Sequence, residues 1–365
     1  MVSIDAAGLS RRKMHGVAMN RTARGIVVAV VCLLLAGALY VALRTPQMVE
    51  VDSGYKVVMG TFSRVVAIAR SEKVARACIA AAFEEQERVN ELMSYHNPDS
   101  ELNAVNREAY HRPVEVDEAT FAVLERALHF SELSGGAFDV TIGALGELWR
   151  RAAATDAVPT EAEIAEARSR VGYDKLQLDP NARTVRFAAE GMKIDLGGIA
   201  KGFAIDKAVE AMKAAGAIGG MIDIGGDIRC FGRPPKGQQS WRVGLQDPNV
   251  APDDMTAGKP LFVLKVMDRA VTTSGDYRRF ATVKGRRQSH IMDTRSGRGA
   301  DALASVTIIA PDATSADALA TAVSVLGLDK GLALIEQVPD TEAILILHGE
   351  NTNLVFSSGA RAYVQ

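Results

Sequence analysis

The stretch DLGGIAKGFAID, residues 195–206, decides the fold, because it leads from a pair of predicted strands into a predicted helix. We predict short strands at 184–188 and 192–196 and a helix over about 200–215. The paired glycines at 197–198 allow the backbone to approach a ligand without a Cβ atom in the way. Amide groups at the start of the helix can face a phosphate, and Lys201 adds positive charge. A tight structural turn is the alternative reading of any single Gly-Gly pair.

The segments on either side of this stretch indicate an α+β protein. VVMGTFSRVVAIA, from residue 57, alternates like a strand, and helices are predicted at 72–93 and 118–134. After the central helix, strands are predicted at 220–224, 241–245, 261–266, 278–283 and 305–309. Two late helices, at about 314–326 and 329–337, interrupt them. We therefore predict mixed, mostly antiparallel sheets with flanking helices.

The N-terminal part carries a membrane signal. From Ile26 to Leu43 the chain has no charged residue, and this length of helix just spans a hydrocarbon core. Basic residues precede the run, so the positive-inside rule leaves the N-terminus in the cytoplasm and the body outside. The predicted organisation is a cytoplasmic tail (1–25), a transmembrane helix (26–43), a tether (44–56) and a catalytic domain (57–365). The expected location is the inner membrane, with the catalytic domain on the periplasmic side. A cleaved signal ending near Ala38 and a lipidated Cys32 remain alternatives.

Composition excludes some classes of function. Of the 365 residues, 48% are apolar and 24% are charged, and the formal net charge is -2. This apolar share at this length is enough to form a full hydrophobic core. No long basic run with interleaved aromatic residues follows residue 45, so nucleic acid is a poor ligand candidate. Cys32, Cys78 and Cys230 lack paired spacing, which argues against a zinc site and leaves one disulfide open, Cys78 to Cys230.

Two further clusters can carry chemistry. In TSADALATAVSVLG (314–327), Asp317 and Thr321 lie four residues apart and share one helix face, where their oxygen atoms suit a hard cation such as Mg²⁺. A dipole-favoured acid in the first turn and a packed threonine are the alternative. In QSHIMDTRSG, His290 follows a predicted strand and can take a proton from a hydroxyl nucleophile, unless it is structural.

Taken in order, the clusters resemble the ApbE family of FAD:protein FMN transferases. The matching segments include MGTF (59–62), MSYHNPDSEL (93–102), GGAFDVTIGALGELW (135–149), DLGGIAKGFAID (195–206), IGGDIR (224–229), TSGDYRRF (273–280), SHIMDTRSG (289–297) and ADALATAVSVLG (316–327). The resemblance spans Met59 to Gly327. It implies an enzyme that binds FAD with Mg²⁺ and attaches FMN to a threonine (or serine) of a target protein while AMP departs.

The resemblance also implies roles for single residues. The FAD site would be lined by Met59, His96, Ala137, Phe138, Asp139, Asp195, Lys201 and Met292. Asp317 and Thr321 would hold the metal with the main-chain oxygen of Gly198, and His290 would be the general base. At the position where the family often has an aromatic residue, this chain has His96 preceded by Tyr95, so either ring can meet the flavin.

The acceptors implied by the resemblance are subunits of sodium-pumping NADH:quinone reductases and of Rnf-type electron-transfer complexes. Two other functions remain alternatives. One is FAD pyrophosphatase activity, in which water replaces the acceptor and FAD yields FMN and AMP. The other is a non-catalytic, periplasmic FAD-binding protein.

Overall fold

The computed structural model describes residues 21–44, 48–248, 260–275, 280–348 and 353–365. The chain divides into two units, residues 1–47 and 48–365, and each is described by itself. In the described part of the first unit, helix α1 (Arg21–Arg44) covers the predicted membrane segment. The predicted tail up to residue 20, and residues 45–47 of the predicted tether, lie outside the described residues.

Two helices matter for the membrane prediction. Among the described residues, α8 (Ala313–Ile335) is long and apolar enough to span a membrane, but 61% of its most apolar window is buried in the second unit. It is therefore a core helix. Within α1 the described side chains give a shorter apolar segment, Arg24–Ala36.

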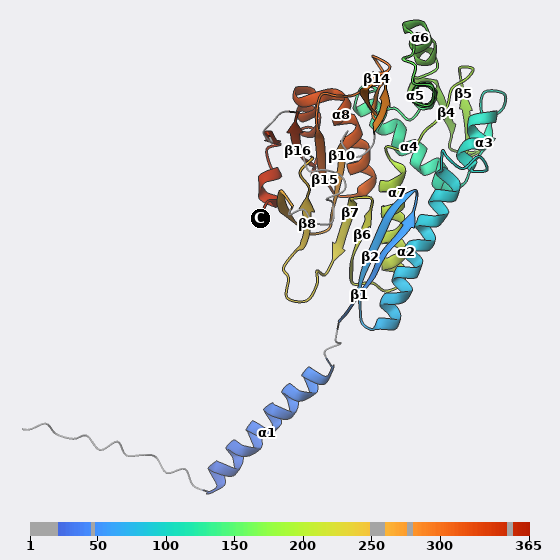
Figure 1. Ribbon diagram of the computed structural model, residues 1–365. Helices are drawn as coiled ribbons and strands as arrows, with labels where there is room; N and C mark the ends of the chain where they lie inside the picture. The colour runs from blue at the N-terminus through green and yellow to red at the C-terminus, as the bar shows by residue number, and fades with distance from the viewer. Residues whose placement is uncertain (1–20, 45–47, 249–259, 276–279, 349–352) are drawn as a thin grey trace, which may run out of the picture. The chain divides into compact units, whose positions relative to one another are not determined.

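In the described part of the second unit, eight strands form one antiparallel sheet in the order β1-β2-β6-β7-β10-β15-β16-β17 (Figure 1). The bounds are β1 (Val49–Val58), β2 (Thr61–Ala69), β6 (Gly219–Ile224), β7 (Asp227–Gly232), β10 (Arg269–Gly275), β15 (Ser305–Ala310), β16 (Glu342–Leu347) and β17 (Asn353–Phe356). Hairpins β1–β2 and β6–β7 turn at the same end of the sheet, because Ser63 pairs with Ile224.

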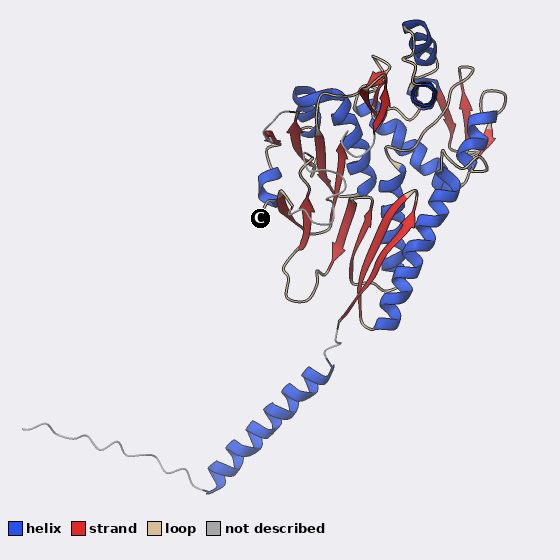
Figure 2. Ribbon diagram, viewed as in Figure 1, coloured by secondary structure: helices blue, strands red, loops and turns tan. Residues whose placement is uncertain are grey.

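Helices cover one face of this sheet (Figure 2): α2 (Glu72–Met93), α7 (Ala200–Ala214) and α8. Helix α2 begins after Ser71, whose side chain accepts a hydrogen bond from the N–H of Val74. Its buried residues recur three and four positions apart, which is the spacing of a single helix face. Helix α8 is apolar on nearly all sides and is buried accordingly.

The other face of the sheet packs against a smaller layer. Strands β8 (Trp241–Leu245) and β9 (Phe262–Val266) pair with each other, and their buried residues contact Val66 and Ile68 of β2. The short helix η3 (Ala360–Tyr363) completes this layer. The second half of β2 has core on both faces, and its sequence is accordingly apolar without a break from Val65 to Ala69.

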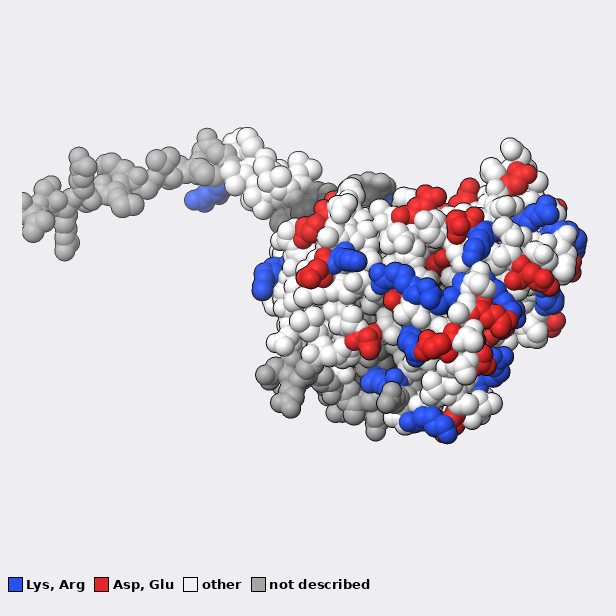
Figure 3. Space-filling model, turned by 90° about the horizontal axis from the view of Figure 1, so that it is seen from above, with Lys and Arg blue, Asp and Glu red and all other residues white. Residues whose placement is uncertain are grey.

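The remaining elements form the end of the body that carries the site loops. They are α3 (Glu101–Glu108), β3 (Val114–Glu115), α4 (Glu118–Leu133), α5 (Gly143–Thr155), α6 (Glu161–Ser169), η1 (Tyr173–Lys175), β4 (Leu176–Asp179), β5 (Thr184–Phe187), β11 (Phe280–Val283), β12 (Arg286–Ser289), β13 (Met292–Asp293) and β14 (Arg298–Gly299). On the face of the protein seen in Figure 3, acidic and basic side chains are interspersed rather than separated by sign.

The fold class predicted from sequence is confirmed as α+β with an antiparallel sheet, and the two late helices are the halves of α8, which bends at Gly327. Two predicted segments were wrong. Residues 49–56 are not a tether but most of β1. The predicted strand at 192–196 is reduced to one bridge between Lys193 and Ile142. The disulfide left open between Cys78 and Cys230 is not formed, because the two thiols are buried in the cores on opposite sides of the sheet.

Candidate active site

The first turn of α7 lies against the first turns of α8. The N–H of Gly202 donates a hydrogen bond to Oδ2 of Asp317 over 3.0 Å. A Cβ atom at residue 202 would lie 2.2 Å from the carbonyl oxygen of Ala313, so only glycine permits this approach. The close backbone contact brings the loop 195–199 and the face of α8 that carries Asp317 together.

Gly198 and Thr321 meet in the same place. A Cβ atom at Gly198 would lie 3.0 Å from Oγ1 of Thr321 and 3.3 Å from Cε2 of Phe138. Asp317, one turn before Thr321, is 2% exposed. The three groups predicted as metal ligands are thus neighbours in the fold.

These groups suit a hard cation. A carboxylate, a hydroxyl and a main-chain oxygen are ligands that Mg²⁺ accepts, usually together with phosphate oxygens of a substrate. Among the described residues, no three His, Cys, Asp or Glu side chains form a metal cluster. A cation held here would be bound by the carboxylate of Asp317, and phosphate oxygens of a nucleotide would complete its coordination when one is bound.

Charged neighbours surround Asp317. Burial raises the pKa of Asp317 to about 6; the Lys201 ammonium opposes this rise, and the Asp227 carboxylate adds to it. Lys201 itself forms an ion pair with Asp227, the first residue of β7. The site therefore contains two buried carboxylates and the ammonium group of a partly exposed lysine.

Asp206 fixes the start of α8. Its carboxylate accepts hydrogen bonds from the N–H groups of Ala313 and Thr314, each over 2.9 Å, and pairs with Nη1 of Arg229 at 2.6 Å. Burial raises the pKa of Asp206, while the Arg229 charge lowers it. Because Asp206 lies one turn after Gly202, this contact sets the position of α8 along α7 and so the position of Asp317.

We expect Asp206→Ala to lower the free energy of unfolding by about 3–5 kcal/mol, since it leaves Arg229 without its buried counter-charge. Two N–H groups of the helix start also lose their acceptor. Urea denaturation followed by tryptophan fluorescence measures this loss. Glu210→Ala is the matched control, because Glu210 is exposed on the same helix, and it should change stability by less than about 0.5 kcal/mol. Equal midpoints for the two variants would contradict the role given to Asp206.

The loop that follows α4 contributes Ala137, Phe138 and Asp139, all buried. Phe138 contacts Gly198, as described above. Asp139 accepts hydrogen bonds from the N–H groups of Thr141, at 2.8 Å, and Tyr173, at 2.9 Å. Burial raises its pKa, and these bonds lower it. Asp139 thus holds its own loop to the first residue of η1.

Met59 occupies the turn of hairpin β1–β2. It has a φ of 53° and Gly60 a φ of 68°, so the turn has the geometry of type I′, which is strained for methionine. The turn of β6–β7 is bonded to the start of β2, directly after this turn, because the N–H of Gly225 donates to the carbonyl of Phe62 over 2.8 Å. Both turns lie at the end of the sheet that also carries Asp227.

His290 follows β12 directly, as predicted, and its side chain is exposed. The next residue, Ile291, packs in a small cluster with Ala137 and Val325. Oγ1 of Thr294 donates to the carbonyl of Gly136 over 2.8 Å, which ties the same loop to the loop after α4. His290 therefore lies beside the Ala137 loop and close in sequence to a buried anchor.

Met292, predicted to line the FAD site, is 9% exposed and belongs to a hydrophobic cluster with Leu145 and Trp149 of α5. The N–H of the Trp149 indole donates to the carbonyl of Gly297 over 2.8 Å. This cluster and this hydrogen bond hold the loop that contains His290 against α5. Of the segment TSGDYRRF, residues 276–279 lie outside the described residues.

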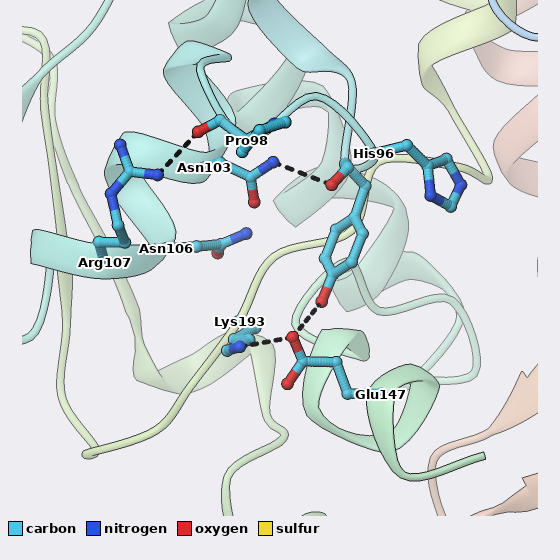
Figure 4. A pocket seen from close by; sticks show the side chains of 8 residues that line it. His96, Pro98, Asn103, Asn106, Arg107, Glu147 and Lys193 are labelled. Atoms are coloured by element: carbon cyan, nitrogen blue, oxygen red, sulfur yellow. Dashed lines mark hydrogen bonds and ion pairs between the residues drawn. The ribbon is translucent and has the colours of Figure 1, made fainter. Parts of the chain in front are cut away.

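His96 lines a pocket of about 320 Å³ with Tyr95, Pro98, Asn103, Asn106, Arg107, Glu147 and Lys193 (Figure 4). His96 is exposed, whereas Tyr95 is half-buried and donates a hydrogen bond to Glu147 over 2.9 Å. Burial raises the pKa of Tyr95, and its bond to Glu147 adds to this rise. Figure 4 shows the His96 ring turned away from Arg107 and Lys193.

Arg150 connects this pocket with Asp195. Its guanidinium lies 4.5 Å from the centre of the Tyr95 ring and 3.8 Å from Oδ2 of Asp195. Asp195 accepts a hydrogen bond from the N–H of Gly197 over 2.9 Å, which shapes the loop before α7. Neither Arg150 nor Glu147 was predicted as a site residue from the sequence, although Glu147 lies within the motif GGAFDVTIGALGELW (135–149).

A second pocket, of about 490 Å³, lies between the loop after α4, the end of α6 and the loop after β13. It is lined by Gly135, Gly136, Asp139, Ala165, Arg168, Ser169, Val171, Gly172, Tyr173, Asp174, Thr294 and Arg295. Arg295 donates to the carbonyl of Val325 on α8 over 3.2 Å. Thr294 and Arg295 were not singled out from the sequence.

Known proteins resemble this chain along most of its length. Residues 59–345 match the ApbE family. The FAD:protein FMN transferase of Treponema pallidum is 38% identical over 305 residues, which is 80% of this chain and 83% of that protein. The FAD:protein FMN transferase of Vibrio cholerae is 34% identical over 258 residues, 69% of this chain and 75% of that protein.

Solved structures agree with these matches. The crystal structure of the ApbE protein from Thermotoga maritima has a TM-score of 0.75 and 32% identity, over 87% of this chain and all of that one (100%). The flavin transferase ApbE from Vibrio cholerae has a TM-score of 0.72 and 28% identity, over 87% of this chain and 99% of that one. With the fold, the motif order and the identity all in agreement, the chain belongs to the ApbE family.

Proposed function

We propose that this protein moves FMN from FAD to the hydroxyl group of a threonine (or serine) in a target protein, with Mg²⁺ bound and with AMP as the second product. Curated relatives over most of the chain are FAD:protein FMN transferases, and this chain is an FAD:protein FMN transferase. The observation that carries the finer proposal is the meeting of Asp317, Thr321 and Gly198 beside Lys201.

Asp317, Thr321 and the main-chain oxygen of Gly198 would hold Mg²⁺, and the Lys201 ammonium would face the pyrophosphate. The N–H groups of Ala200, Gly202 and Phe203 already donate within the protein, so the phosphate contacts predicted for the start of this helix are not made by them. Such an ion would draw negative charge from the phosphate under attack and from the departing AMP. Lys201 and the positive end of the α7 dipole would stabilise the remaining charge. Met59, His96, Ala137, Phe138, Asp139, Asp195 and Met292 would position the rest of FAD.

His290 would act as the general base. The acceptor hydroxyl gives its proton to the imidazole, and its oxygen forms a bond to the phosphorus of the FMN half. The bond from that phosphorus to the bridging oxygen breaks, and AMP leaves with the bonding electron pair. An exposed histidine on a supported loop suits this role, because a protein acceptor must reach it from solvent.

The protein is anchored in the inner (cytoplasmic) membrane by α1, and its catalytic unit lies on the periplasmic side. Two observations support this part of the proposal. The run from Ile26 to Leu43 is uncharged and follows a basic segment. Within its unit, Leu33 and Leu34 are 73% and 68% exposed, and such apolar surface needs a lipid environment or a partner. Acceptors are subunits of sodium-pumping NADH:quinone reductases or Rnf-type electron-transfer complexes.

Mass spectrometry tests the proposed reaction. We expect a purified acceptor subunit, incubated with the full-length protein, FAD and Mg²⁺, to gain the mass of one FMN residue on a threonine. Chelation of divalent ions should prevent the gain. Free FMN appearing at a comparable rate with no acceptor present would instead indicate a pyrophosphatase. Intact FAD in all reactions would indicate a binding protein without this chemistry.

A further inference from the structure

The ion pair between Lys201 and Asp227 joins the first turn of α7 to the first residue of β7. The Asp227 side chain is only 1% exposed, and the Lys201 side chain is 25% exposed. A buried carboxylate needs a counter-charge, because burying an unpaired charge has a large unfavourable desolvation free energy. Asp227 therefore determines where the ammonium group of Lys201 lies.

The same ammonium also acts on Asp317. Lys201 and Asp227 are the charged groups with the largest effects on this buried carboxylate, with opposite signs. Oδ2 of Asp317 is engaged by the N–H of Gly202, over 3.0 Å. If Lys201 turned to Asp317, its ammonium group would pair with the remaining oxygen of that carboxylate, which a divalent cation needs as a ligand. The positive charge of Lys201 would also offset the negative charge that attracts the cation.

We propose that Asp227 is a positioning residue that holds Lys201 away from Asp317, so that Asp317 stays available to the divalent cation and Lys201 to the phosphates of FAD. This inference rests on the proposed function, because it assigns the same site to Mg²⁺ and FAD. Asp227 does not touch either ligand in this account; it acts through Lys201. The carboxylate follows the tight turn Gly225–Gly226, so its place is set by the β6–β7 hairpin.

Titration of the full-length protein with Mn²⁺ alone, followed by electron paramagnetic resonance, tests the inference without catalysis. We expect Asp227→Asn to weaken Mn²⁺ binding by about 10-fold to 100-fold, the range typical for the loss of a residue that orients metal ligands. In the Lys201→Met background, the same Asp227→Asn change should weaken binding by less than about 3-fold, since the competing ammonium is absent.

FAD binding, followed by flavin fluorescence without metal, gives a second readout. Asp227→Asn and Lys201→Met should each weaken it, and the double variant should be no weaker than Lys201→Met alone. Glu210→Gln is the matched control, because Glu210 is exposed on the same helix and pairs with Lys207 at 2.9 Å rather than with a site residue. It should leave both titrations unchanged.

Equal losses of Mn²⁺ affinity in the two backgrounds would overturn the inference, because Asp227 would then act through its own charge or through folding. An Asp227→Asn variant that binds Mn²⁺ like the parent protein would overturn it as well. The background-dependent pattern supports the inference even if no acceptor gains mass, so the inference and the transferase proposal can fail separately.

Discussion

Asp317→Asn is expected to lower the rate of FMN transfer by about 10³-fold or more, since a metal ion at a phosphoryl group contributes several kcal/mol to the transition state. Asparagine preserves the size of the side chain and can still accept the hydrogen bond from Gly202. It removes the charge of the one carboxylate predicted to bind the cation. The fold should therefore survive while the metal site is lost.

The rate of acceptor flavinylation at saturating FAD measures this effect. Asp329→Asn is the matched control, because Asp329 is exposed on the same helix and undergoes the same chemical change. It should retain the parent rate. A transfer rate for Asp317→Asn within about 3-fold of the control would remove Asp317 from the mechanism.

The pH dependence of the metal requirement follows from the same carboxylate. Burial raises the pKa of Asp317 to about 6, so protons compete with a cation for this group below that pH. The concentration of Mg²⁺ needed for half-maximal transfer is accordingly expected to rise as the pH falls from about 7 to about 5. At higher pH the carboxylate is ionised, and the requirement should level off.

His290→Ala is expected to lower the transfer rate by about 10²-fold to 10⁴-fold while FAD and Mn²⁺ still bind with nearly the parent affinity. The reason is that a threonine hydroxyl is too weak an acid to ionise near neutral pH without a base. The imidazole of His290 is exposed, whereas the next residue, Ile291, is buried and anchors the loop. Removing the imidazole should therefore leave the loop in place. Single-turnover measurement of acceptor mass gain, with separate binding titrations, distinguishes chemistry from binding.

His111→Ala is the control for this variant, because His111 is also exposed but lies in the turn after α3. It should transfer FMN at the parent rate. If His290→Ala lost FAD binding in proportion to its rate, His290 would be a binding residue and the base would have to be sought elsewhere.

Sequence reasoning was most reliable where a local pattern decides the structure. The helices at 72–93, 118–134 and 200–215 appear within a residue or two of the expected bounds, because apolar spacing and caps are local signals. The placement of Asp317 and Thr321 on one helix face was equally local. Their approach to Gly198 rested on the family resemblance, and the geometry agrees with it.

Several of the errors and omissions involve partners that are distant in sequence. Residues 49–56 contain Asp52, Ser53 and Gly54, which disfavour a strand, and β1 forms there because β2 offers a paired edge. Asp206 and Asp227 looked like ordinary acids in the motifs. Their roles depend on α8 and on Lys201, which are brought to them only by the tertiary fold.

The spacing of α7 and α8 at Gly202 limits how this enzyme can change. A Cβ atom at residue 202 would lie 2.2 Å from the carbonyl oxygen of Ala313, so main-chain atoms set the distance between the two helices. Mutational libraries should therefore recover glycine alone at this position, and altered acceptor preference should arise in the surrounding loops. The contact between α7 and α8 at the site is therefore expected to tolerate no substitution at residue 202, and the surrounding loops are expected to tolerate more.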